Sequence, residues 1–169
     1  MKPTHRNLPL LLLHAREAAL AHFRPILKRF GLTDQQWRIL RVLSEARNGL
    51  EPGQIAEACK IQKPSLTGIL TRMTETKLIE REVSEHDQRK QRISLSTKGI
   101  AVVDRVTPLI DLQYQRIETM VGVETLTDTY RTLDAMLALL SRSDSSAVDH
   151  GAKLRSKRRR GADYGTPRA

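Results

Sequence analysis

Residues 63–99 read KPSLTGILTRMTETKLIEREVSEHDQRKQRISLSTKG, and this stretch decides the fold class. The apolar residues that recur at the spacing of one buried helix face are Leu66, Ile69, Leu70 and Met73. The opposite face carries short polar side chains and a glycine, and Pro64 suits the first turn of a helix. The stretch therefore opens with a helix that has one apolar face and one face of mostly small side chains.

The second half of this stretch changes from helical spacing to alternation. Two short alternating segments, residues 79–83 and 92–95, flank a charged run at 84–90 that reads SEHDQRK. Alternation on both sides of a polar turn predicts an antiparallel hairpin. Its tip carries two adjacent cations.

A short helix is expected just before this stretch. Pro52 after Glu51 predicts its first turn, and its apolar face consists of Ile55, Ala56 and Cys59. Two short helices followed by a basic hairpin follow the order of a winged helix-turn-helix, which we place at residues 33–96. The predicted fold class is mainly α.

The helix face of small side chains and the hairpin tip are the candidate DNA-binding surfaces. Bulky outward side chains would keep a recognition helix out of the major groove. The tip can reach an adjacent minor groove, where Asp87 can orient Arg89 through an ion pair. The candidate DNA-binding residues are Lys63, Ser65, Thr67, Gly68, Thr71, Arg72, Asp87, Arg89 and Lys90. The alternatives are an ordinary exposed helix start, solvated hairpin charges, and an ion pair of Arg72 with Glu75 or Glu80.

Helical patterns flank this domain on both sides. They cover residues 8–30, 97–121 and 124–140. Pro25 and Pro108 lie inside the first two patterns and predict a kink or break in each. Thr33 and Gln36 form the pattern of a capping box, which opens a further helix that is expected to end near residues 48–49.

The positive charge is concentrated at the C-terminal end. The 169 residues carry a formal charge of +10, and residues 150–169 supply +6 of it through seven basic residues and one acidic residue. The apolar period stops before residue 145, so residues 145–169 are predicted to be a basic disordered tail. Such a tail either adds non-specific attraction to DNA or stays solvated.

Several classes of protein are excluded by composition. The single cysteine, Cys59, cannot form an intramolecular disulfide or a thiolate metal cluster, which indicates a reducing, cytoplasmic location. The apolar run at 8–13 is too short to span a membrane, and we expect no signal peptide, metal site or cofactor. A Gly-rich phosphate loop, a nucleophile elbow and a paired acid–base constellation are absent, so no enzyme is expected.

The hairpin also carries a family resemblance. Asp87-Gln88-Arg89, followed by Leu95-Ser96-Thr97-Lys98-Gly99, resembles the wing signature of the MarR family, with Ser96 where threonine is usual. The resemblance covers roughly residues 8–142. It implies a homodimer whose N- and C-terminal helices, within 1–32 and 97–144, form the dimerisation domain. Two-fold symmetry then implies a pseudo-palindromic operator in double-stranded DNA, with half-sites ~10 bp apart.

Runs around Arg16, Trp37 and Ser65 resemble the subgroup of that family that represses homoprotocatechuate catabolism. This resemblance implies a repressor released by a small aromatic acid of the hydroxyphenylacetate class. Arg16 is the candidate anchor for the carboxylate, because a guanidinium binds a carboxylate through two parallel hydrogen bonds. The candidate ligand-binding residues are His14, Arg16, His22, Trp37 and Arg41.

Each ligand candidate has a plainer interpretation. Arg16 can instead form an ion pair with Glu17 across a dimer interface, and Trp37 can be an ordinary core residue. The histidines and Arg41 can be surface or dimer contacts. For the whole protein, the alternative is a non-specific basic nucleic-acid-binding protein without a small-molecule effector.

Overall fold

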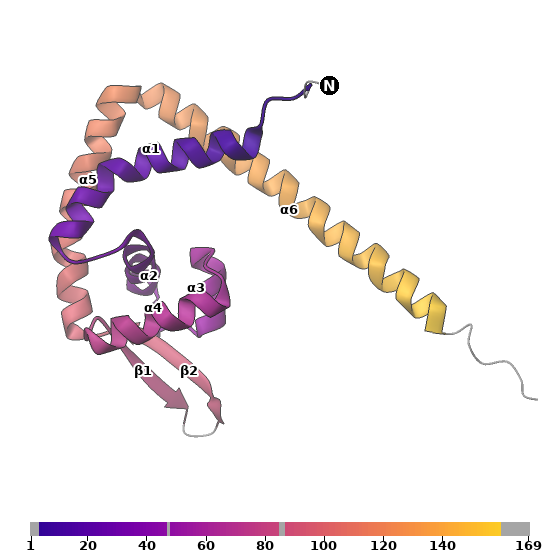
Figure 1. Cartoon of the computed structure of the whole chain (residues 1–169), viewed down its shortest axis with the longest axis horizontal. Coiled ribbons are helices and arrows are strands. Elements are labelled where there is room, and N and C mark those ends of the chain that lie inside the picture. Colours follow the sequence, from indigo (N-terminus) through magenta and orange to yellow (C-terminus); the bar gives the residue numbers. More distant parts are fainter. Residues whose placement is uncertain (1–3, 47, 85–86, 160–169) are drawn as a thin grey trace, which may run out of the picture. The chain divides into compact units, whose positions relative to one another are not determined.

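The computed structural model describes the backbone of residues 4–46, 48–84 and 87–159, and their side chains except at 83–90 and 142–159. The chain forms two compact units, Met1–Arg116 and Ile117–Ala169. In chain order the elements are α1 (Leu8–Arg29), α2 (Asp34–Glu45), α3 (Pro52–Cys59), α4 (Lys63–Glu75), β1 (Ile79–Ser84), β2 (Asp87–Leu95), α5 (Thr97–Val121) and α6 (Val123–Arg159) (Figure 1). Among the described helices, none is long and apolar enough to cross a membrane.

The start of α2 confirms the predicted capping box. The backbone N–H of Gln36 donates to Thr33 Oγ1 at 3.2 Å, and the backbone N–H of Thr33 donates to Gln36 Oε1 at 2.9 Å. Two backbone donors at the helix start are thereby satisfied. The helix ends at Glu45, one turn before the expected end, because Ala46 already has an extended conformation.

The helices α1 and α5 run through their prolines without a break. Pro25 lies inside α1 and Pro108 lies inside α5. Each proline is exposed, while buried neighbours lie on either side of it, Phe23 and Leu27 around the first. Packing of these neighbours outweighs the one backbone hydrogen bond that a proline removes.

The core of the first unit joins α2, α3, α4 and the hairpin. Its most completely buried side chains include Ile39, Leu40, Ile55, Met73, Ile79 and Ile93, each at most 1% exposed. The buried faces predicted for α3 and α4 are confirmed, with Ile69 half-buried. The small polar face of α4 is consequently turned to solvent.

The hairpin is longer than predicted on its second strand. β2 begins at Asp87 rather than at residue 92, and the strands pair antiparallel from Ile79↔Leu95 to Val83↔Gln91. The register then shifts, so that Ser84 pairs with Asp87. This irregularity extends the ladder into the charged run, where the sequence pattern predicts only a turn.

Two glycines fix how the hairpin meets the helices. A Cβ on Gly49, which has a φ of +67°, would lie 2.7 Å from the carbonyl oxygen of Ile93. A Cβ on Gly99 would lie 2.0 Å from the carbonyl oxygen of Leu78. The loop before α3 and the start of α5 therefore approach the hairpin too closely for any side chain.

The second unit is formed mainly by α6, which is helical to Arg159. The expected disordered tail at 145–169 therefore begins as a continuation of the helix. Residues 142–159 contain alanine, lysine and arginine, which favour helix, and no proline occurs between Pro108 and Pro167. Residues 160–169 lie outside the described part of the chain.

Candidate nucleic-acid interface and ligand-binding residues

The exposed face of α4 consists of the residues predicted for it. Lys63, Ser65, Thr67, Gly68, Thr71 and Arg72 are all exposed. The hydroxyl of Thr67 donates to the Lys63 carbonyl at 3.3 Å, and that of Thr71 donates to the Thr67 carbonyl at 3.0 Å. These bonds hold both hydroxyls against the helix surface, where each oxygen still presents lone pairs as an acceptor.

The packing of the chain does not require a glycine at position 68. A Cβ built on Gly68 would meet no heavy atom within 4 Å. Glycine in a helix costs roughly 0.5–1 kcal/mol relative to alanine, so an open helical glycine weakens the fold without a packing reason. It does leave room for a close approach from outside the chain.

Arg72 makes neither of the ion pairs that were open alternatives. Among the residues that the structure describes, no carboxylate lies within ion-pair distance of its guanidinium. The side chain is exposed at the end of the polar face of α4, so its charge remains available to an anion.

The wing residues are placed by their backbone alone. Asp87, Arg89 and Lys90 belong to β2, at the register irregularity near the turn. Their side chains lie outside the described part of the chain. The ion pair between Asp87 and Arg89 therefore stays a prediction.

Three further arginines, none of them among the candidate site residues, tie the domain together. Arg38 donates to the Cys59 carbonyl at 2.6 Å, joining α2 to the end of α3. Arg92 donates to the Asn48 carbonyl at 2.9 Å, joining β2 to the loop before α3. Arg81 donates from Nε to Thr74 Oγ1 at 3.1 Å, joining β1 to α4. No sequence motif indicates these bonds, because they depend on which elements pack together.

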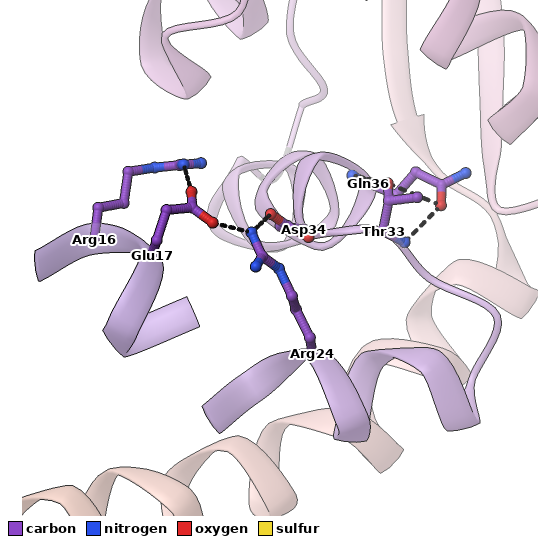
Figure 2. Close-up of polar contacts among 6 residues, drawn as sticks. All are labelled: Arg16, Glu17, Arg24, Thr33, Asp34 and Gln36. Atoms are coloured by element: carbon purple, nitrogen blue, oxygen red, sulfur yellow. Dashed lines mark hydrogen bonds and ion pairs between the residues drawn. The ribbon is translucent and has the colours of Figure 1, made fainter. Parts of the chain in front are cut away.

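A chain of ion pairs links α1 to the start of α2 (Figure 2). Arg16 contacts Glu17 at 2.6 Å, and the other oxygen of Glu17 contacts Arg24 at 2.7 Å. Arg24 also lies 3.4 Å from Asp34, the first residue of α2. Hydrogen bonds from Arg24 to Glu17 and Asp34 raise the pKa of the Arg24 guanidinium above its ordinary value.

The five ligand candidates differ in exposure. Trp37 is buried, at 8% exposed, whereas His14, Arg16, His22 and Arg41 are exposed on α1 and α2. Arg16 pairs with Glu17 of its own chain, which differs from the pairing across a dimer that we considered. Within the described residues, no hydrogen bond or ion pair joins any two of the five. Their assignment to one ligand site stays a prediction.

Cys59 is buried at 1% exposed at the end of α3. Burial raises the pKa of its thiol, although the charge of Arg38 opposes the shift. A buried thiol with a raised pKa is a poor nucleophile. In the part of the chain that the structure describes, no group of three or more His, Cys, Asp or Glu residues could hold a metal ion.

Comparison with known proteins places this arrangement in a family. Residues 30–90 match the sequence model of the MarR family. Over 135 residues the chain is 42% identical to the homoprotocatechuate degradative operon repressor of Escherichia coli, covering 80% of this chain and 90% of that protein. The chain belongs to the MarR family. The expected mainly α winged-helix fold is confirmed by the structures that this MarR protein resembles.

The similar structures include complexes with a small acid and with DNA. NadR in complex with 4-hydroxyphenylacetate is similar with a TM-score of 0.68 and 34% identity, covering 80% of this chain and 96% of that chain. The MepR–DNA complex of S. aureus is similar with a TM-score of 0.70 and 25% identity, covering 79% of this chain and 98% of that chain. Each match spans nearly all of the solved chain but about four fifths of this one. Most of the residues that the matches leave out are therefore in this MarR protein.

Proposed function

We propose that this MarR protein is a transcriptional repressor that binds a pseudo-palindromic operator as a homodimer and is released by a small aromatic acid. The observation that carries the proposal is the solvent-facing surface of α4. It has short hydroxyl side chains, an open glycine at Gly68 and a cation at Arg72 that pairs with none of the described carboxylates. This surface fits a major groove, where base edges require close approach and phosphates require positive charge.

A second copy of the chain is the partner that the apolar surface requires. Large exposed hydrophobic residues cluster on α1 and α6, and they include Leu8, Leu10, Leu11, Leu13, Leu137 and Leu140. Single apolar residues on a surface are ordinary, but clusters of this kind on long helices mark protein contacts. Residues 1–32 and 97–144 would form the dimer, and 33–96 would bind DNA with half-sites ~10 bp apart.

The effector that we propose is a hydroxyphenylacetate. Arg16 has an exposed guanidinium, and a carboxylate ligand can compete for it with Glu17. His14, His22, Trp37 and Arg41 would complete the site. Release requires that the acid favour a spacing of the two α4 helices that does not fit the operator. A coupling of ~1–3 kcal/mol would weaken operator binding by ~5–150-fold.

The polar side chains that we single out serve binding, and we propose no catalytic activity. The free thiol of Cys59 favours a cytoplasmic location, where thiols stay reduced.

The test is the effect of acids on a preformed complex with DNA. Fluorescence anisotropy would follow a labelled duplex from the gene's own upstream region, with 4-hydroxyphenylacetate and 3,4-dihydroxyphenylacetate titrated in separate experiments. Release by either acid supports the effector class, and Arg16→Ala should abolish the response while DNA affinity is retained. Operator binding that ignores both acids would retain the repressor and refute the effector. Turnover of either acid by the purified protein would contradict the absence of catalysis.

A further inference from the structure

Arg81 holds its guanidinium beside the recognition helix. In the hairpin register Arg81 pairs with Ile93, which is completely buried, so this position of β1 is on the side facing the helices. From there Arg81 Nε donates to Thr74 Oγ1 at 3.1 Å, and Nη2 lies 3.5 Å from Thr71 Oγ1. The side chain remains exposed to solvent.

The two hydroxyls are set up as acceptors for Arg81. The hydroxyl of Thr71 donates its proton to the Thr67 carbonyl at 3.0 Å, and that of Thr74 donates to the Leu70 carbonyl at 2.9 Å. With their protons committed to the helix, both oxygens present lone pairs to the guanidinium. Neutral acceptors thereby orient the cation without neutralising its charge.

This environment differs from that of the arginines that form ion pairs. Arg16, Arg24 and Arg131 contact carboxylates. No described carboxylate lies within 4.0 Å of the Arg81 nitrogens, and the neighbouring Glu80 and Glu82 alternate to the opposite face of the strand. Since a guanidinium has five N–H donors, three of them remain beyond the two that face the hydroxyls.

We propose that Arg81 binds a phosphate of the DNA backbone where the strand passes between α4 and the wing. This inference rests on the proposed function and adds a residue to its DNA-binding surface. A planar, charged fork with donors that no described residue uses matches a phosphate, and Thr71 connects it to the α4 face that would enter the groove. Such a contact fixes the depth and orientation of α4 without reading sequence.

The test uses the salt dependence of DNA affinity in the full-length protein. Each lost phosphate contact reduces the slope of log K against log salt by about 0.9 on duplex DNA, so Arg81→Gln should reduce it by about 1.8 in a dimer. At ~0.15 M salt the affinity should fall roughly 10- to 30-fold, to a similar extent on upstream and scrambled duplexes. Arg131→Gln removes the same charge from α6 and should leave the slope unchanged.

Two further readouts separate a phosphate contact from a structural role. Arg81→Lys keeps the charge, so it should retain most of the slope. Circular dichroism melts should show a similar small loss of stability in Arg81→Gln and Arg81→Lys, which both lose the paired bonds to Thr74 and Thr71, and none in Arg131→Gln. An unchanged slope in Arg81→Gln, with or without lost affinity, would overturn the proposal. If the wild type does not prefer the upstream duplex, the proposed function fails, while the slopes on the scrambled duplex still decide the role of Arg81.

Discussion

At the scale of single residues, Gly68 and Gly99 are both helical glycines with opposite reasons for being glycine. Gly99 is required by the fold, because a Cβ there would lie 2.0 Å from a backbone oxygen. Gly68 faces open space, and no atom of the protein would contact a side chain built there. The contrast supports the proposal that Gly68 leaves room for DNA against α4.

Gly68→Ala should therefore make the protein more stable and a weaker DNA binder. The free energy of unfolding should rise by about 0.5–1 kcal/mol, because alanine favours helix and meets no obstacle. Urea denaturation measures the first effect, and anisotropy with operator DNA measures the second. A variant that is stabilised yet binds operator with unchanged affinity would show that α4 does not approach DNA at this residue.

At the scale of elements, the wing is anchored by arginines that reach outside the hairpin. Arg92 contacts the loop carbonyl of Asn48, 44 positions away in sequence, and Arg81 contacts α4. The pairing of Ile93 with Leu50 adds two backbone hydrogen bonds at 2.8 and 2.9 Å. These contacts fix the wing relative to the helix-turn-helix. A fixed position is needed if α4 is to enter the major groove while the wing reaches the adjacent minor groove.

Arg92→Ala should loosen this anchor. The side chain is exposed, so the loss of unfolding free energy should be modest, about 1 kcal/mol. Amide hydrogen exchange should rise at Gly49–Glu51 and at the base of β2, while α1 stays protected. Glu82→Ala is a suitable control, because Glu82 pairs with Arg92 across the strands but makes no described ion pair. Equal exchange in Arg92→Ala and wild type would contradict the anchoring role.

The sequence predicted these elements unevenly. The capping box at Thr33 and the two-faced helix α4 could be recognised because their signals lie within one turn of helix. The bonds of Arg38, Arg81 and Arg92 could not, since each depends on the register and packing of separate elements. The continuation of α6 to Arg159 was missed because its residues lack an apolar period although they favour helix. The grouping of the ligand candidates stays a prediction.

At the scale of the whole molecule, the account requires two copies of the chain. The apolar residues of α6 that recur at alternating spacings of four and three are Leu126, Tyr130, Leu133, Leu137 and Leu140. Leu137 is 59% exposed and Leu139 is 67% exposed, but Leu139 falls outside this spacing. The two leucines therefore offer a matched comparison.

Leu137→Glu should shift the protein from dimer to monomer, because a charge in an apolar seam has no partner there. Leu139→Glu introduces the same charge two residues away, and it should leave the dimer intact. Sedimentation equilibrium measures both, and loss of operator binding should accompany the monomer alone. If Leu139→Glu dissociates the protein and Leu137→Glu does not, a different face of α6 forms the interface.

The central claim is that the surface of α4 and the wing reads a particular DNA sequence. The most direct test is the ratio of affinities for the upstream duplex and a scrambled duplex, measured by anisotropy at ~0.15 M salt. We predict a ratio of at least about 10³, the range of specific DNA-binding proteins. A ratio near one would contradict the account and indicate a basic protein that binds nucleic acid through charge alone.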